Sequence, residues 1–358
     1  MRKKKILYFV EAFGGGVFTY ICNLANTLCD EYDIYVAYGI RKQTPTDFKN
    51  YFDNRVHLIQ VKNYQREISI KRDLAALKEM REITKDIQPD VVHLNSSKAG
   101  ILGRWLFRNS KIPVFYTPHG YSFLMTNTSK RKRFFYRSLE KMFAFKNIET
   151  IACSKSEYEI TKQLTSNATY VDNGINLKEF DNININHKIN FNHLKIATLG
   201  RISFQKNPIM FNQIAEIFPN LEFIWIGDGD LRDKLTAPNI KITGWVDNKT
   251  ALNYLSSADI FILTSLWEGL PMALLEAMYM KKICIVSDVC GNRDVIRDEY
   301  NGYICNTVNQ FQSRIKSQIS NKNVYLDLVD NAQKSITGHY NLNVMACEYD
   351  KIYKKAIN

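Results

Sequence analysis

The feature that most constrains this chain is a regular alternation of short apolar runs, each of strand length, with longer segments of helical periodicity. Alternation of this kind is typical of βαβ units, in which helices cover the faces of a parallel sheet. A first series of strand-like runs occupies 6–10, 32–38, 56–61, 90–95, 113–119, 150–154 and 168–174. A second series occupies 195–200, 221–227, 240–245, 259–265 and 282–288. The sequence therefore predicts an α/β protein with two doubly wound, Rossmann-like sheets in tandem.

The length of the chain supports two domains, because 358 residues exceed what one hydrophobic core usually holds. The Asn-rich stretch 181–193 lacks helical periodicity, and we interpret it as an interdomain linker. We therefore expect an N-terminal domain over 1–180, a C-terminal domain over 194–340, and a final helix within 341–358 that returns to the N-terminal domain. Ligands of such sheets bind beyond the carboxyl ends of the strands. We expect the two domains to face a central cleft, with the residues after each strand as candidates for function.

The positive charge of the chain is unevenly distributed. Residues 1–175 carry 28 Lys and Arg against 17 Asp and Glu, whereas residues 176–358 carry 20 against 19. This asymmetry indicates that the first half faces an anionic partner, either phospholipid or nucleic acid. No segment approaches the roughly 18 to 20 apolar residues that span a bilayer. The seven scattered cysteines, without a C-x-x-C pair, argue against a disulfide framework and a zinc site and favour a reducing cytoplasm.

Two features of the first half follow predicted strands. Gly15 and Gly16 lie in EAFGGGVF, where glycines between a strand and a helix let the backbone approach a phosphate, although a tight structural turn explains them equally well. A lone histidine is more often structural than functional, but His119 lies at the carboxyl end of the fifth strand, a position that favours a functional role. His93 lies inside a strand pattern, and we interpret it as structural.

Two cations follow the first strand of the second series. Arg201 and Lys206, in LGRISFQKNP, have the charges and the loop position to clamp a pyrophosphate, the arginine through its planar fork and the lysine as a point charge. A solvated loop is the alternative. The nearby strand ends IGDGD, which contains Gly227, and ITGWV, which ends at Val246, favour a binding site.

The stretch LTSLWEGLPMALLEAM places a turn between a strand and a helix. We predict that Pro271 occupies the first helical position, where its missing N–H costs nothing. The amides of Gly269, Leu270 and Met272 are then free to bind an anion or sugar oxygens.

Two carboxylates accompany this predominantly apolar run. Glu268 projects from the turn, and Glu276 lies among apolar residues of the helix. A buried carboxylate without a partner costs several kcal/mol. The hydroxyl groups of a ribose and a hexose are suitable partners, and an ordinary amphipathic helix accounts for Glu268 but not for Glu276.

These motifs together resemble the retaining glycosyltransferases of family 4, which have the GT-B fold and include enzymes of bacterial surface and capsular polysaccharide synthesis. EGLPMALLE matches the family's pair of glutamates, and GRISFQKNP matches its Gly-Arg followed five residues later by Lys. ACSKSE (152–157), DNGIN (172–176) and SDVCGNRDVI (287–296) follow the family's order. Two positions depart from the pattern, because Asn176 stands where Asp is frequent and Asn207 stands where glycine often follows the lysine.

The resemblance implies a role for each matching position. Arg201 and Lys206 would bind the diphosphate of a nucleotide-sugar donor, most simply a UDP-sugar, in place of a metal ion. Glu268 would hold hydroxyls of the transferred hexose or N-acetylhexosamine, and Glu276 would bind the ribose. His119 would contact the sugar and stabilise an oxocarbenium-like transition state. The implied donor-binding positions also include Gly15, Gly16, Gly227, Val246, Gly269, Leu270 and Met272.

A basic and aromatic segment, NTSKRKRFFYRSLEKMFAFKN (127–147), completes the set of candidate sites. On a helix it presents a surface of the kind that lies in a membrane interface, although a core helix with a solvated basic face is the alternative. We expect it to bind anionic phospholipid at the inner face of the cell membrane and to receive a lipid-linked saccharide acceptor. The residues concerned are Lys130, Arg131, Lys132, Arg133, Phe134, Phe135 and Arg137.

Two other classes of protein fit part of the sequence. Nucleotide-sugar 2-epimerases share the two-domain architecture. A basic nucleic-acid-binding protein would explain the charged first half. No recognised nucleic-acid-binding module is visible, so we expect no nucleic-acid partner.

Overall fold

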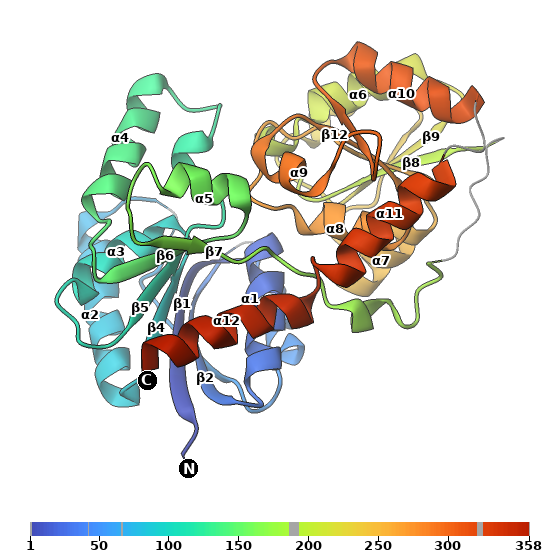
Figure 1. The fold of residues 1–358 in the computed structure, drawn as a ribbon. Helices are drawn as coiled ribbons and strands as arrows, with labels where there is room; N and C mark the ends of the chain where they lie inside the picture. The colour runs from blue at the N-terminus through green and yellow to red at the C-terminus, as the bar shows by residue number, and fades with distance from the viewer. Residues whose placement is uncertain (1, 42, 66, 186–192, 321–324, 358) are drawn as a thin grey trace. The chain divides into compact units, whose positions relative to one another are not determined.

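The computed structural model describes residues 2–357 apart from 42, 66, 186–192 and 321–324. The chain forms two compact units (Figure 1). Unit 1 contains Met1–Asn173 together with Leu342–Asn358, and unit 2 contains Gly174–Asn341. Unit 2 thus begins before the segment 181–193 that we interpreted as a linker, and residues 186–192 of that segment lie outside the described residues.

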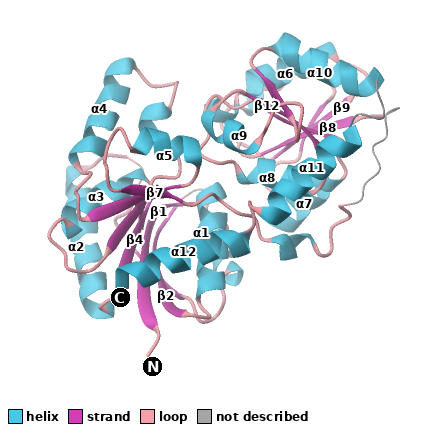
Figure 2. Ribbon diagram, viewed as in Figure 1, coloured by secondary structure: helices cyan, strands magenta, loops and turns pink. Residues whose placement is uncertain are grey.

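In the described part of unit 1, seven parallel strands form one sheet in the order β3-β2-β1-β4-β5-β6-β7. Helices cover both faces of this sheet (Figure 2), which explains why the middle of β1 is buried without a polar alternation. The strands are β1 (Lys4–Phe13), β2 (Tyr32–Ile40), β3 (His57–Gln60), β4 (Val91–Asn95), β5 (Val114–Thr117), β6 (Ile148–Ala152) and β7 (Ala168–Tyr170). The helices are α1 (Gly15–Leu28), η1 (Phe48–Tyr51), α2 (Ile70–Ile87), α3 (Ser97–Phe107), η2 (Ser122–Leu124), α4 (Lys130–Met142), α5 (Lys155–Thr161) and α12 (Leu342–Ile357).

The described part of unit 2 has six parallel strands in the order β10-β9-β8-β11-β12-β13. They are β8 (Lys195–Leu199), β9 (Glu222–Ile226), β10 (Ile240–Ile242), β11 (Ile260–Leu263), β12 (Ile283–Ser287) and β13 (Tyr303–Cys305). The helices are η3 (Leu177–Phe180), η4 (Phe204–Lys206), α6 (Pro208–Ile217), η5 (Arg232–Lys234), α7 (Asn248–Ser256), α8 (Met272–Tyr279), α9 (Cys290–Val295), α10 (Val308–Ser320) and α11 (Tyr325–Gly338). The strand β13 was not predicted from the sequence.

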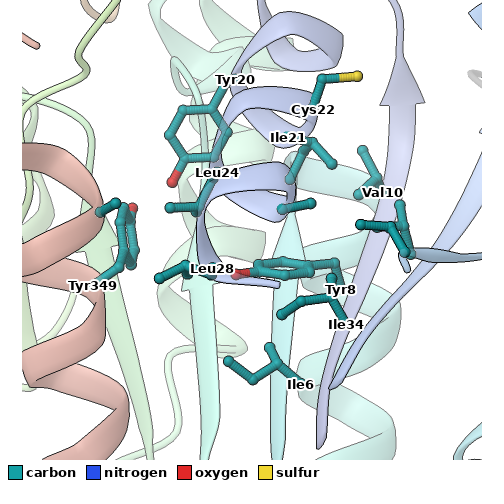
Figure 3. Close-up of a cluster of buried hydrophobic side chains, with 14 of the residues drawn as sticks. Ile6, Tyr8, Val10, Tyr20, Ile21, Cys22, Leu24, Leu28, Ile34 and Tyr349 are labelled. Carbon is teal, nitrogen blue, oxygen red and sulfur yellow. The ribbon is translucent and has the colours of Figure 1, made fainter. Parts of the chain in front are cut away.

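The C-terminal helix α12 packs against α1 and the sheet of unit 1 through its tyrosines. Figure 3 shows Tyr349 of α12 in the same core as Tyr8 of β1 and Tyr20 of α1. The hydroxyl of Tyr353 lies 3.2 Å from that of Tyr8, and the hydroxyl of Tyr32 donates to Asp350 at 2.8 Å. These polar contacts within an apolar core tie α12 to β1 and β2.

Because every strand pair is parallel, all the strands of one unit end at the same edge of its sheet. In unit 1 this edge carries the glycine turn after β1, the end of β4 and the loop after β5. In unit 2 it carries the loops after β8, β9, β10 and β11. All the predicted donor-binding residues except Met272 and Glu276 lie in these loops or in the first turn of α1, and those two belong to α8, which follows β11.

Candidate active site

The loop after β8 carries the two predicted cations of unit 2. Gly200 begins it with a φ of 141°, and Lys206 ends the short helix η4. Asn207 follows in the left-handed conformation with a φ of 52°, and its side-chain oxygen caps α6 by accepting from the amide of Met210 at 3.4 Å. A left-handed position explains why glycine often follows the lysine in the family, and asparagine tolerates this conformation better than most residues. The departure at Asn207 therefore leaves the loop geometry intact.

Lys206 and Glu268 form a largely buried ion pair at the edge of the sheet. The ammonium Nζ of Lys206 lies 2.7 Å from Oε1 of Glu268, and the side chains are 15% and 7% exposed. The same carboxylate accepts from the hydroxyl of Ser265 at 2.6 Å and from the amide of Gln205 at 3.3 Å. These contacts hold both charges in place before any ligand binds. An ammonium has three donors and a carboxylate about four acceptor positions, so each group retains capacity for a ligand.

Glu276 has the opposite environment. Its side chain is buried in α8, and no hydrogen bond or ion pair to its carboxylate occurs among the described residues. Burial is the main cause that raises its pKa to about 8, the charge of Glu179 raises the pKa further, and that of Lys206 opposes the shift. A buried carboxyl group without a protein partner is costly unless a ligand supplies hydrogen bonds.

The N-terminus of α8 differs by one residue from our prediction. The helix begins at Met272, so Pro271 is the N-cap residue and not the first helical residue. Its φ of −78° suits either position, but its ψ of 115° is extended, and its carbonyl accepts from the amide of Leu274 at 3.1 Å. No side chain caps this helix end. The helix dipole at Met272 is therefore not offset by an acidic side chain in the first turn.

Several glycines of unit 2 have a packing role independent of any ligand. A Cβ atom on Gly227 would clash with the carbonyl of Gly200, and one on Gly291 would clash with the carbonyl of Gly269. Gly227 also has a φ of 133°. Close approach of neighbouring strand ends thus accounts for Gly227, and the glycine is weaker evidence for a binding site than we expected. Val246 is half-buried beside the exposed Trp245.

The edge of unit 1 places His119 in a neutral polar environment. His119 is half-buried with a φ of 55°, and its Nε2 lies 3.0 Å from the side-chain oxygen of Asn95. Tyr20 packs edge-to-face on the imidazole, with ring centroids 4.5 Å apart. Burial lowers the pKa of His119 to about 3. The next amide, that of Gly120, donates to the buried carboxylate of Glu157 at 2.7 Å, which fixes the turn.

His93 is structural, as the sequence indicated. It is fully buried in β4, its Nδ1 lies 2.6 Å from the hydroxyl of Tyr353, and its Nε2 lies 2.9 Å from the hydroxyl of Thr117. Burial and the nearby His119 lower its pKa to about 3. Both ring nitrogens are engaged by protein groups, so His93 links the sheet to α12.

Gly15 and Gly16 begin α1 with open space around them. Gly15 has a φ of 56°, which favours glycine, whereas a Cβ atom on Gly16 would meet nothing within 4 Å. Neither packing nor backbone conformation therefore requires glycine at position 16. Gly14 differs, because a Cβ there would lie 3.1 Å from the Cβ of Gln43.

Helix α4 carries the predicted basic and aromatic surface of unit 1. Phe134 and Phe135 are 74% and 50% exposed, and Lys130, Arg131, Lys132 and Arg137 are also exposed. Arg133 differs, because it is half-buried and donates to the carbonyl of Phe123 at 2.9 Å.

A buried ion pair attaches α4 to the body of unit 1. Arg104 of α3 and Glu140 of α4 are 2.6 Å apart, and their side chains are 2% and 3% exposed. Glu140 also accepts from the hydroxyl of Tyr116 at 3.1 Å, and the Arg104 guanidinium lies over that ring. This network holds one face of α4 against unit 1 while the basic and aromatic side chains remain in solvent.

The sequence analysis did not identify the polar partners of the candidate residues. Asn95 contacts His119, and Gln205 and Ser265 contact Glu268. Gln205 and Ser265 lie within the motifs already recognised, so their position was a usable signal. Asn95 ends a predicted strand, but nothing in the sequence distinguishes it from other polar residues at strand ends.

Comparison with known proteins places this arrangement in a family. Residues 14–179 match the model described as Glycosyltransferase Family 4, and residues 179–335 match the model described as Glycosyl transferases group 1. A UDP-Gal:alpha-D-GlcNAc-diphosphoundecaprenol alpha-1,3-galactosyltransferase of Escherichia coli is 30% identical over 82% of each chain. The chain belongs to the family 4 glycosyltransferases and is a glycosyltransferase.

Other similar proteins act on related substrates or share the fold. An alpha-1,4-N-acetyl-D-galactosaminyltransferase of Campylobacter jejuni, named for an undecaprenol-linked saccharide, is 31% identical over 39% of this chain and 42% of its own. Sucrose-phosphate synthase from Thermosynechococcus elongatus has a TM-score of 0.83 at 15% identity, covering 99% of both chains. The Anabaena protein HepE, solved with UDP-glucose, has a TM-score of 0.79 at 15% identity over 98% of this chain and 99% of its own. The last two likenesses establish the GT-B fold.

Proposed function

We propose that the protein transfers a hexose or N-acetylhexosamine from a UDP-sugar to a lipid-diphosphate-linked saccharide during bacterial surface polysaccharide synthesis. The observation that carries this proposal is the Lys206–Glu268 ion pair with the buried Glu276 nearby, whose carboxylate has no hydrogen bond from the described part of the chain. A fixed cation suits a diphosphate, and a carboxyl group without a protein partner suits the hydroxyls of a ribose. The names of the E. coli and C. jejuni relatives support the acceptor class.

Unit 2 would bind the donor. Arg201, Lys206 and the amides of Gly269, Leu270 and Met272 would hold the diphosphate and the nearby sugar oxygens. Glu276 would accept from the ribose, and Val246 would lie beside the base. The remaining acceptor position of the Glu268 carboxylate would accept from a hydroxyl of the transferred sugar. Of the unit 1 residues, Gly15 and Gly16 would approach the diphosphate, and His119 would contact the sugar, as the family resemblance implies.

The reaction would retain the configuration at the anomeric carbon. The bond from that carbon to the diphosphate oxygen breaks, the acceptor hydroxyl forms the new bond on the same face, and its proton passes to a phosphate oxygen of the leaving group. Arg201 and Lys206 would stabilise the negative charge that develops on the diphosphate, the role that a divalent ion fills in other transferases. We expect a chelator to leave turnover unchanged.

A thermal-shift panel tests the donor. We expect a UDP-sugar to raise the melting temperature more than GDP- and dTDP-sugars at equal concentration, because a ligand that binds only the folded state stabilises it by mass action. Donors that stabilise the protein are then incubated with a lipid-diphosphate-linked saccharide, and the anomeric configuration of the product is read by NMR. A shift with no UDP-sugar, or an inverted product, would contradict the proposal.

We also propose that α4 binds the inner face of the cell membrane. Its exposed lysines, arginines and phenylalanines have the composition of an interfacial helix, and each basic residue near an anionic leaflet contributes about 1 kcal/mol. None of the helices in the described ranges is long and apolar enough to cross a membrane.

Cosedimentation with phosphatidylglycerol vesicles at low salt tests the role of α4. Replacing the exposed Lys130, Arg131 and Lys132 with Gln should weaken binding about a hundredfold, while Arg133 is kept because its side chain bonds to the fold. The matched control replaces three exposed lysines of unit 2, Lys234, Lys241 and Lys249, with the same change in net charge. Equal losses in the two variants would mean that the attraction is not located at α4.

A further inference from the structure

The side chain of Asn95 can only accept a hydrogen bond from His119. Asn95 is fully buried at the end of β4, and its Nδ2 donates to the carbonyl of His93 at 3.2 Å. This bond sets the orientation of the amide, because the side-chain oxygen cannot donate to a carbonyl. The oxygen Oδ1 therefore faces Nε2 of His119 at 3.0 Å. Since Oδ1 only accepts, Nε2 must carry the proton.

The other ring nitrogen of His119 is then an acceptor. Burial lowers the pKa of His119 to about 3, so the ring is neutral at physiological pH and has a single proton. With that proton on Nε2, Nδ1 presents a lone pair. Within the described ranges of the chain, no protein group hydrogen-bonds Nδ1. The left-handed backbone of His119, with a φ of 55°, is the kind of strain that concentrates at functional sites.

We infer that Asn95 is a positioning residue that holds His119 as the Nε2-protonated tautomer, so that Nδ1 accepts a hydrogen bond from a hydroxyl of the bound sugar. The inference rests on the proposed function only for the identity of the ligand. A lone pair repels a phosphate oxygen and attracts an O–H, so the residue selects a sugar hydroxyl over the diphosphate. The tautomer itself is a property of the protein without ligand.

The groups that face His119 come from several elements. Tyr20 of α1 packs on the ring, His93 of β4 lies close enough to affect the electrostatics, and Glu157 of α5 binds the amide of Gly120. The pKa of Tyr20 is raised well above its usual value by burial, and that of His93 is lowered to about 3, so neither changes charge near neutral pH. Burial raises the pKa of Glu157 as well, although its hydrogen bonds from backbone amides oppose the rise.

The tautomer is tested directly by NMR of the ligand-free protein with ¹⁵N-labelled histidine. The resonances of His119 are assigned from their loss in the His119→Gln variant. We expect Nε2 to have the shift of a protonated nitrogen and Nδ1 that of an unprotonated one, unchanged between pH 6 and 8. Protonation at Nδ1, or a fast mixture of both tautomers, would overturn the inference whether or not the protein transfers sugar.

Two substitutions of Asn95 test its effect on the site. In Asn95→Asp the carboxylate still accepts from Nε2 but favours the imidazolium, which raises the pKa of His119. Activity should then be retained at high pH and lost as the pH falls through the raised pKa, because a protonated Nδ1 donates instead of accepting. In Asn95→Leu the tautomer is no longer set, and KM for the donor should rise about tenfold at every pH with a smaller change in kcat.

A third variant separates positioning from stability. Asn212 of α6 is another buried asparagine, and it accepts from the amides of Thr236 and Ala237 at 2.7 and 2.8 Å. Asn212→Leu should lower the melting temperature without altering the pH profile or the tautomer of His119. If Asn95→Asp kept the wild-type pH profile, or Asn95→Leu kept the wild-type KM, Asn95 would have only a structural role.

Discussion

The carboxyl edges of the two sheets have the same topology and different side chains. In unit 2 the edge carries a lysine and a glutamate fixed against each other, and a second glutamate, Glu276, has no hydrogen-bonding partner among the described residues. In unit 1 the edge carries the ion pair of Arg41 and Glu11, a neutral histidine, a buried amide and a glycine turn. Parallel α/β sheets place loops at this edge in both cases, so the fold provides the position and the side chains determine the chemistry.

The side chains of each edge suit different parts of a nucleotide-sugar. In unit 2, the lysine suits a diphosphate and the carboxylates suit hydroxyl groups. In unit 1, His119 suits a sugar hydroxyl and the glycine turn suits a phosphate.

The largest expected effect is that of removing the fixed cation. Lys206→Met should lower kcat about 100- to 1,000-fold, because a preorganised charge that stabilises the leaving group is lost. The control is Lys234→Met, which removes an exposed lysine paired with Asp233 in the same unit. Steady-state kinetics measure both. A decrease in kcat of less than threefold for Lys206→Met would show that Lys206 does not stabilise the leaving group.

A smaller effect is expected from the partnerless carboxylate. Glu276→Gln should weaken UDP binding roughly 10- to 100-fold, because a charged hydrogen-bond acceptor for the ribose is replaced by a neutral one. Isothermal titration calorimetry measures the affinity. Glu222→Gln, at an exposed residue of β9 that pairs with Lys195, should leave it unchanged.

The raised pKa of Glu276 predicts a pH dependence of both binding and stability. Hydrogen bonds from the ribose favour the ionised form, so UDP binding near pH 7 should release a proton, seen as a buffer-dependent enthalpy that disappears in Glu276→Gln. In the free protein the folded pKa of Glu276, about 8, exceeds the ordinary glutamate pKa of 4.5. The free energy of unfolding should therefore fall as the pH rises from 4.5 to 8, by a few kcal/mol relative to Glu276→Gln. If the difference in the free energy of unfolding between the wild type and Glu276→Gln did not change with pH, the pKa of Glu276 would not be raised by folding.

The glycine turn of unit 1 offers a more modest test. Gly16→Ala should raise KM for the donor about tenfold if the diphosphate approaches this backbone, since the added methyl group meets no protein atom. The free energy of unfolding should rise by roughly 0.5 to 1 kcal/mol, because alanine favours the helix. Gly338→Ala is the matched control, as its Cβ also meets open space at the end of α11. Equal kinetics in both variants would leave Gly16 without a ligand contact.

The smallest effect on activity is expected at His93. His93→Gln should leave kcat within about twofold of the wild type and lower the free energy of unfolding by roughly 1 to 3 kcal/mol, because buried hydrogen bonds to Thr117 and Tyr353 are disturbed. Because the pKa of His93 is lowered from 6.5 to about 3 in the folded protein, this histidine is protonated in the unfolded state but not in the folded state between these pH values. The free energy of unfolding of the wild type should therefore decrease as the pH is lowered from 6.5 to 3, and it should decrease less steeply in the variant. Urea unfolding at several pH values measures the slope.

Particular elements show where sequence-based prediction succeeded. The apolar runs predicted both parallel sheets, because a strand buried on two faces has to be apolar along its length. The structural role of His93 was also predicted, because the residue lies inside a strand pattern, and its two buried hydrogen bonds confirm that role. The strand β13 and the exact start of α8 were not predicted. The helix boundary depends on the backbone angle ψ of Pro271, which the sequence does not specify.

By itself, the sequence determined which residues follow the strands, and therefore that His119, Lys206, Glu268 and Glu276 stand at or near the sheet edges. Only the tertiary structure decided which of these groups are satisfied by the protein. Lys206 and Glu268 are 62 residues apart in the chain, and Asn95 and His119 are 24 apart. The folded backbone brings each pair within hydrogen-bonding distance, and it leaves Glu276 without a hydrogen-bonding partner among the described residues. Residue order alone does not specify these distances, because they depend on how the strands and loops pack.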